Sequence, residues 1–217
     1  MSLFRVDSSI RTEGSVSRAV ADSIEAGWRQ AHRDGVVERR DLAADPVPAT
    51  AWPTALGAGQ TPAEQRTPEQ VEALALVAAE ADGLAAADAV VIGAPLYNFG
   101  VPQFLKTWID LLILDERFAP GTTPLAGKPV ALVVTRGGGY GEGTPRHGWD
   151  HATGWLRRIL GDVWGGDVTV VEAELTLAAV TPAMSGLVSL AEQSETAAHE
   201  LATTTGRTFA ERVLASV

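Results

Sequence analysis

Five short apolar segments are spaced along the chain, and two of them show no alternation of polar and apolar residues. Ala89–Ala94 and Pro129–Val134 are continuous apolar runs rich in valine. A strand that is buried on both faces, as in the middle of a parallel sheet, has this pattern. We therefore predict that these two segments are central strands. Three further segments predict shorter strands: Leu3–Val6, Val36–Arg39 and Val168–Leu175.

Between these segments, apolar residues recur at the spacing of one helix face. After the first strand, Val16, Val20 and Ile24 fall on one side of a helix. Thr67 begins another helix, because it offers an N-cap hydroxyl, is followed by proline, and has glutamine at the capping-box position. Helices are also expected over residues 101–112 and 149–160 and from about residue 182 onward. This alternation predicts a doubly wound, three-layer α/β fold.

The segment from Asp41 to Thr67 stands apart from this pattern. It contains four prolines and two glycines, which interrupt regular structure. We therefore expect a long loop. Loops of this length often act as lids or subunit contacts, and a simple excursion over the surface fits the sequence equally well.

Composition narrows the class of protein. The chain has 217 residues, of which 46% are hydrophobic, and this suits a single domain with a full core. Its formal net charge of −10 argues against nucleic-acid or anionic membrane partners. There is no cysteine, which excludes disulfides and thiol chemistry and fits a reducing cytoplasm. No targeting segment or apolar run of membrane-spanning length is present, so we expect a cytoplasmic location.

Small hydroxyl residues follow the first strand and open the next helix. Ser9, Ser15 and Ser17 lie there, with Val16 between the last two. Free amides and the positive end of a helix dipole both favour an anion such as phosphate. On these residues alone, an ordinary N-cap is the favoured interpretation. Arg18, together with Arg11, is a candidate counter-charge for a phosphate.

Two turns follow the two central strands. Pro95–Gly100 carries an aromatic pair around Asn98, and Thr135–Gly143 is rich in glycine. Glycines let backbone amides approach a flat ligand closely, and ligands of open α/β sheets bind at the carboxyl ends of the strands. If the two strands are neighbours, these turns face each other across such a site. A flexible surface loop is the alternative for the glycine-rich turn.

The side chains offer no reaction of their own. The sequence contains no G-x-S-x-G nucleophile elbow and no phosphate-binding loop of a nucleoside triphosphatase. His147 and His151 have a spacing that can hold a metal, but no partner motif accompanies them, and the start of a solvated helix is the favoured interpretation. We predict no metal site. A cofactor must therefore supply any difficult chemistry.

Several motifs resemble one enzyme family. Pro-Leu-Tyr-Asn-Phe-Gly-Val-Pro (95–102), followed by Leu-Lys-x-x-Ile-Asp, resembles the flavin loop of the FMN-dependent NADH-azoreductases and NADH:quinone oxidoreductases. The similarity extends to Asp-Ser-Ser-Ile (7–10), Arg-Asp-Leu-Ala-Ala-Asp-Pro (40–46) and Thr-Arg-Gly-Gly (135–138). The resemblance implies a flavodoxin-like fold with a five-stranded parallel sheet of order 2-1-3-4-5.

The resemblance also implies a cofactor and the residues that bind it. Noncovalent FMN would place its phosphate on Ser9, Ser15, Val16 and Ser17. Leu96, Tyr97, Asn98 and Phe99 would lie along one side of the flavin ring, and Thr135, Arg136, Gly137 and Gly138 would border its polar edge, with Arg136 a candidate to stabilise the charge of reduced flavin. Phe118, Asp162 and Trp164 would contribute to the substrate pocket.

The implied activity is a two-electron reduction of quinones and aromatic azo compounds, with NADH or NADPH as the electron donor. Donor and acceptor would use the same face of FMN in turn, which predicts ping-pong kinetics. Relatives of this kind form homodimers, so Phe118 would reach the partner's site. Asp162 stands where many relatives have an aromatic residue, which favours a cationic acceptor or a specialised reduction. The alternatives are a flavodoxin-like binding module without turnover and a one-electron flavodoxin.

Overall fold

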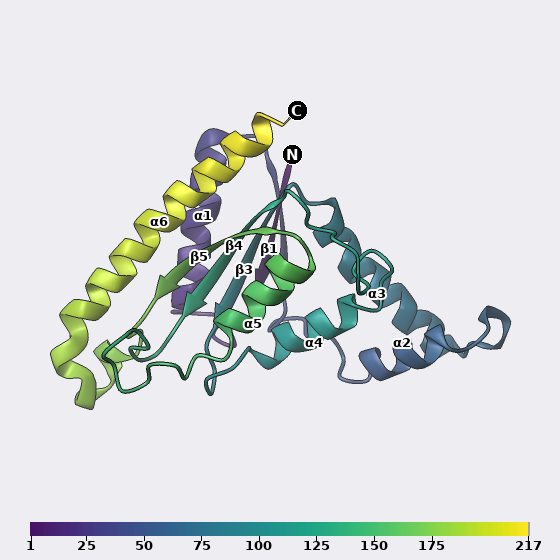
Figure 1. Ribbon diagram of the computed structural model, residues 1–217, viewed down its shortest axis with the longest axis horizontal. Helices are drawn as coiled ribbons and strands as arrows, with labels where there is room; N and C mark the ends of the chain where they lie inside the picture. The colour runs from purple at the N-terminus through teal and green to yellow at the C-terminus, as the bar shows by residue number, and fades with distance from the viewer. Residues whose placement is uncertain (217) are drawn as a thin grey trace.

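The fold is built around one parallel sheet. The computed structural model describes residues 1–216. Its strands are β1 (Ser2–Asp7), β2 (Val36–Asp41), β3 (Ala89–Pro95), β4 (Pro129–Thr135) and β5 (Asp167–Ala173). Every neighbouring pair is parallel, and the order is β2-β1-β3-β4-β5, as predicted (Figure 1). All residues of β3 and β4 are buried, which explains why these two strands have continuous apolar sequences.

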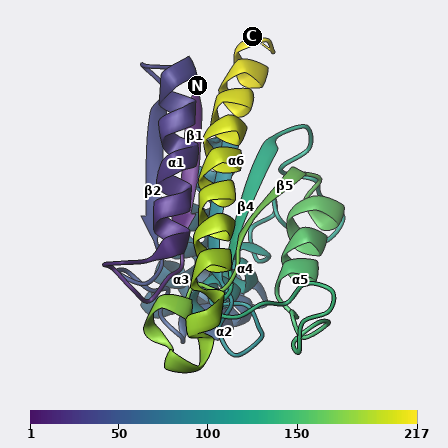
Figure 2. The same ribbon diagram turned by 90° about the vertical axis from the view of Figure 1, so that its left-hand side faces the viewer.

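Two helices, α1 (Val16–Ala31) and α6 (Val188–Leu214), cover one face of the sheet. They lie side by side along their lengths (Figure 2). Ile24 and Trp28 of α1 pack with Val91 and Val133 of the sheet in a buried cluster that Phe209 of α6 completes. This packing fixes helix α1, which begins at the carboxyl edge of the sheet, against the sheet.

Four helices lie on the opposite face: α2 (Ala51–Gly59), α3 (Pro68–Ala86), α4 (Gln103–Leu112) and α5 (Thr153–Arg157). Ile92 and Leu132 from the sheet join Trp108 of α4 in the larger buried cluster. The predicted capping box at the start of α3 is present, because Thr67 Oγ1 accepts a hydrogen bond from the Gln70 backbone N–H and Gln70 Oε1 accepts one from the Thr67 backbone N–H. Helix α3 continues past Gly83 to Ala86.

The expectation of one long loop over 41–67 is wrong. The segment contains α2 and a short 3-10 helix, η1 (Ala63–Gln65). Pro53 is compatible with α2 because it occupies the first turn, where its missing N–H has no partner to lose. Ala55 and Ala58 are buried, and α2 packs on α3. Tertiary packing therefore maintains a helix whose sequence is rich in breakers.

The carboxyl-terminal third departs from its predicted boundaries in smaller ways. Helix α5 begins at Thr153 rather than Trp149 and continues into a π-helical turn, η2 (Arg158–Val163). Two 3-10 helices, η3 (Ala178–Val180) and η4 (Pro182–Leu187), precede α6, so the α-helix itself starts at Val188. Within residues 1–216, no helix has the length and apolar content that crossing a membrane requires.

Candidate functional site

A cavity of ≈ 280 Å³ lies at the carboxyl edge of β1, β3 and β4. It brings together the three turns that sequence analysis singled out, because Ser9, Tyr97 and Gly137 line the same space. The order of the sheet explains this convergence, since β3 lies between β1 and β4. The lining residues are Ser9, Ile10, Arg11, Gly14, Ser15, Val16, Pro95, Leu96, Tyr97, Thr135, Gly137, Thr176 and Leu177.

Serine hydroxyls and a helix start form one end of the cavity. Ser15 is the N-cap of α1, with its side chain accepting from the Arg18 amide at 3.5 Å. Ser17 is almost fully buried and its Oγ lies 3.2 Å from that of Ser15. The N-cap interpretation is therefore confirmed, and it leaves the free amides and positive dipole end of a 16-residue helix beside the cavity. This end suits an anion.

The turn after β3 has an unusual backbone. Asn98 and Phe99 both have positive φ, at 47° and 66°, and the Tyr97 and Gly100 backbones hydrogen-bond to each other on either side of them. Asparagine tolerates this region, whereas phenylalanine adopts it at a cost of about 1–3 kcal/mol, and such strain is common at functional sites. Tyr97 directs its hydroxyl to Ser9 Oγ at 3.3 Å and to the Ile10 amide at 3.2 Å. The turn is thus tied to the serine-rich end.

The turn after β4 forms the other wall. The carbonyl of Thr135, the last residue of β4, accepts a hydrogen bond from the Leu96 amide at 2.8 Å, which joins the two central turns. The Leu177 amide donates to the Gly137 carbonyl at 3.3 Å, and a Cβ at position 137 would lie 2.7 Å from Leu177 Cδ1. A side chain at position 137 would displace that of Leu177, because the segment after β5 packs directly on the glycine.

A family model for the flavodoxin-like fold matches residues 1–195. A FMN-dependent NADH:quinone oxidoreductase of Streptomyces avermitilis is 40% identical over 215 residues, covering 98% of this chain and 99% of the relative. One from Frankia alni is 41% identical over 198 residues, covering 90% and 93%. The chain belongs to the FMN-dependent NADH:quinone oxidoreductase family. Among solved structures, an azoreductase from Bacillus anthracis str. Sterne has a TM-score of 0.78 at 25% identity, covering 96% of this chain and 100% of that one.

The resemblance to this family predicted that Arg136 would lie at the polar edge of the flavin. Its side chain is 6% exposed and forms ion pairs with Asp150 at 2.7 Å, Glu172 at 2.8 Å and Glu174 at 3.3 Å. Burial alone would raise the pKa of the Asp150 carboxyl, but hydrogen bonds from Thr153 and Arg136 outweigh it and lower the pKa. Asp150 Oδ1 also accepts hydrogen bonds from the Ala152 and Thr153 amides at the start of α5. The Arg136 side chain therefore holds α5 and β5 to the glycine-rich turn, and its donors are already engaged.

Five of the predicted cofactor residues do not line this cavity: Ser17, Asn98, Phe99, Arg136 and Gly138. Asn98 lies in a second cavity that shares Ile10, Leu96 and Tyr97 with the first. Phe99 is 37% exposed and contacts the Trp149 ring edge-on, with centroids 5.4 Å apart. Gly138 follows Gly137 in the turn and leaves room for the Arg146 side chain.

The structure does not support the substrate-pocket assignments that were carried over from the family. Phe118 and Trp164 are core residues, 1% and 0% exposed, with their rings packed edge to face at 5.2 Å. Asp162 lies on the exposed side of η2, where it forms an ion pair with Arg158 at 3.2 Å and lines a separate cavity beside Gly154. Trp164 directly follows the π-helical turn and is buried, whereas Asp162 within the turn is exposed.

Sequence reasoning missed Ile10, Thr176 and Leu177 as cavity residues. The last two follow β5 at the same edge of the sheet, so the rule that identified the other turns applies to them as well. His147 and His151 belong to no cluster of metal-ligating side chains within the described part of the chain. Asp150 between them accepts amide hydrogen bonds at the start of α5 instead.

Proposed function

We propose that this chain binds FMN noncovalently in the cavity and uses NADH or NADPH for two-electron reduction of quinones and aromatic azo compounds. The observation that carries the proposal is the convergence of three turns on one cavity, with hydroxyls and helix amides at one end and glycine backbone at the other. Relatives of about 40% identity are named FMN-dependent NADH:quinone oxidoreductases, which supports the same activity here.

The residues present fit FMN. Ser9, Ser15 and Ser17, with Val16 at the first turn of α1, offer hydroxyls and amides for the phosphate. The ring would lie between residues 96–99 on one side and 135–138 on the other. The contribution of Arg136 would come from its backbone and from holding the turn in place, since its guanidinium is paired.

The cavity wall explains why a cofactor is needed. Among the described residues that line it, Arg11 is the one charged side chain, and there is no carboxylate or imidazole to act as a general acid or base. Bound FMN supplies a centre that takes up a hydride and passes on two electrons. The protein's own part is to orient the ring, to donate hydrogen bonds from backbone amides, and to exclude water with Leu96 and Leu177.

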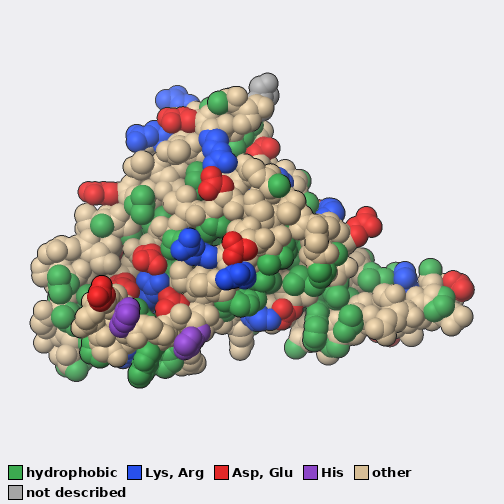
Figure 3. Space-filling view, in the orientation of Figure 1, with side chains coloured by type: hydrophobic (Ala, Val, Ile, Leu, Met, Phe, Trp, Pro, Cys, Tyr) green, Lys and Arg blue, Asp and Glu red, His purple; other side chains and the backbone are tan. Residues whose placement is uncertain are grey.

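We also propose a homodimer. Apolar side chains gather on the side of α2, α3 and α4 in Figure 3, and Trp52, Leu56 and Val71 of α2 and α3 are 44%, 42% and 55% exposed. A surface of this kind supports association between subunits. Because Phe118 is buried within its own subunit, it does not reach a partner's site. Sedimentation velocity at several protein concentrations tests the dimer.

Colour and bleaching test the activity. The purified protein should be yellow, should lose that colour with NADH or NADPH in the absence of oxygen, and should regain it when a quinone or an azo dye is added. Initial rates at several fixed acceptor concentrations should give the parallel double-reciprocal lines of ping-pong kinetics. Intersecting lines would contradict successive use of one site. A colourless protein that takes up no FMN would favour a binding module without turnover.

A further inference from the structure

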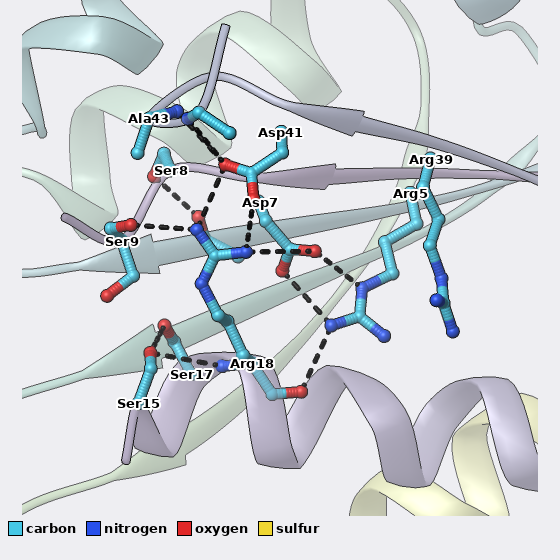
Figure 4. A network of polar contacts seen from close by, with 12 residues as sticks. Arg5, Asp7, Ser8, Ser9, Ser15, Ser17, Arg18, Arg39, Asp41 and Ala43 are labelled. Atoms are coloured by element: carbon cyan, nitrogen blue, oxygen red, sulfur yellow. Dashed lines mark hydrogen bonds and ion pairs between the residues drawn. The ribbon is translucent and has the colours of Figure 1, made fainter. Parts of the chain in front are cut away.

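Arg18 is held in place on all sides by contacts within the protein. It is the third residue of α1, and its side chain is 15% exposed. Its Nη1 and Nη2 donate to the two carboxylate oxygens of Asp41 at 2.6 and 2.9 Å. Its Nη2 also donates to the Ser9 carbonyl at 2.9 Å (Figure 4). Its Nε donates to the Arg11 carbonyl at 2.9 Å. The guanidinium therefore links the end of β2 to the turn after β1.

Asp41 is a fixed anchor for this arrangement. It ends β2, and its Oδ1 also accepts hydrogen bonds from the Ala43 and Ala44 amides at 3.0 and 3.2 Å. The Arg18 guanidinium, helped by these amides, holds the pKa of the Asp41 carboxyl below its ordinary value. Asp7, buried beneath the pair, lies 3.8 Å from Arg18 Nη1. Four of the five guanidinium N–H groups are engaged by these partners, and Asp7 faces the fifth.

The two carbonyls held by Arg18 determine where the adjoining amides point. In a trans peptide the C=O and the following N–H point in opposite directions. Because the Ser9 carbonyl faces Arg18, the Ile10 amide must face away from it, and this amide donates to the Tyr97 hydroxyl at the cavity at 3.2 Å. The same relation applies to the Arg11 carbonyl and the Thr12 amide.

We propose that Arg18 is a positioning residue, which fixes the directions of the Ile10 and Thr12 amides at the phosphate end of the cavity and is itself held by Asp41. It is not a direct counter-charge for the phosphate, which was the expectation from sequence. The proposal rests on the proposed function, since it concerns the phosphate end of that cavity. Arg18 acts on the phosphate through the peptide groups that it holds.

Substitutions of Arg18 and Asp41 test this role. Arg18→Lys keeps the positive charge but cannot hold Asp41 and two carbonyls at once. Asp41→Asn keeps Arg18 and removes a negative charge near the phosphate end. Arg29→Lys, on the same helix and paired with Glu25, is the control. Dissociation constants for FMN and for riboflavin, which lacks the phosphate, are measured by quenching of flavin fluorescence on protein stripped of its cofactor.

We expect Arg18→Lys and Asp41→Asn each to weaken FMN binding by about tenfold, the order of one charge-assisted hydrogen bond, with riboflavin binding unchanged. Arg29→Lys should leave both constants unchanged. Tighter FMN binding by Asp41→Asn, or full retention by Arg18→Lys, would identify Arg18 as a direct ionic ligand and overturn the proposal. Parallel losses for both flavins would show a general structural role and also overturn it.

If the proposal that the cavity binds FMN is wrong, the binding measurements will give a different result. If the wild-type chain binds FMN no better than riboflavin, the phosphate end of the cavity is wrongly assigned, whatever the variants do. If the wild type strongly prefers FMN and the Arg18 and Asp41 variants keep that preference, only the positioning role fails. Hydrogen exchange of the amides of residues 10–12 gives a readout independent of cofactor, and it should be faster in Arg18→Lys.

Discussion

Helices α1 and α6 cross at two glycines, and Gly206→Ala tests how much the protein depends on that contact. A Cβ at position 206 would lie 2.8 Å from the Ile24 carbonyl carbon and 2.9 Å from the Trp28 amide nitrogen. Facing it, a Cβ at Gly27 would lie 3.0 Å from the Thr203 carbonyl carbon. These are backbone atoms, so no change of rotamer relieves the clash. The helices would have to separate.

Two opposing contributions determine the change in unfolding free energy of Gly206→Ala. Replacing glycine by alanine inside a helix gains about 1 kcal/mol. Ordinary contact begins near 3.4 Å, and moving the helices apart by roughly 1 Å loses a quarter to a half of each dispersion contact along the seam. Overpacking of this kind costs about 1–3 kcal/mol and more when backbone is involved. We expect a net loss of about 2 kcal/mol, or about 4–8 °C in Tm for a chain of this length.

Thermal and urea unfolding followed by circular dichroism measure this loss. Gly154→Ala is the matched control, because Gly154 is also helical and nothing lies within 4 Å of its Cβ position. The control should be neutral or stabilised by up to about 1 kcal/mol. If Gly206→Ala is as stable as the control, the close crossing of α1 and α6 does not contribute as argued. The test concerns a part of α6 beyond residue 195, where the family model ends.

Three further predictions concern the polar groups around the cavity. Arg136→Gln should lower the unfolding free energy by about 2 kcal/mol. This is less than the loss on breaking a fully buried ion pair, because the Glu172 carboxylate is half exposed. Equal urea midpoints for the variant and the wild type would contradict the prediction. Tyr97→Phe should weaken FMN binding by about 1 kcal/mol, roughly fivefold, because the contact between the Tyr97 hydroxyl and Ser9 is lost. An unchanged FMN dissociation constant in fluorescence titrations would count against a role of that contact. Because Arg18 lowers the pKa of the Asp41 carboxyl, their pairing stabilises the fold above the ordinary aspartate pKa of about 4, and this contribution is lost as the pH falls below it. The difference in unfolding free energy between wild type and Asp41→Asn should therefore shrink as the pH is lowered from about 4, and a constant difference would refute the assignment.

Much of the fold follows from local sequence. The continuous apolar runs of β3 and β4 identify strands with two buried faces, and their neighbouring positions bring Tyr97 and Gly137 to one cavity. The capping box at Thr67 marks the start of α3 because its hydrogen bonds are made between residues close in sequence. Patterns of this kind need no knowledge of tertiary contacts.

The errors arise where distant contacts decide. Helix α2 is stable because alanines beneath its breakers pack on α3. Arg136 looked available from sequence, yet its three acidic partners come from the segment before α5, from β5 and from the segment that follows β5. Phe118 and Trp164 are 46 positions apart in the sequence and contact each other in the core. No local sequence pattern predicts this contact. Family resemblance identified the cavity, but it did not say which side chains face it.

The parallel sheet has a practical consequence for handling the protein. All strands run in one direction, so the cavity lies at their carboxyl edge while Met1 and the last turn of α6 lie together at the opposite end (Figure 1). A purification tag, an electrode linker or a bead attached at either terminus would hang from the far side of the molecule. Tethered preparations would then present their openings to the medium in a common orientation.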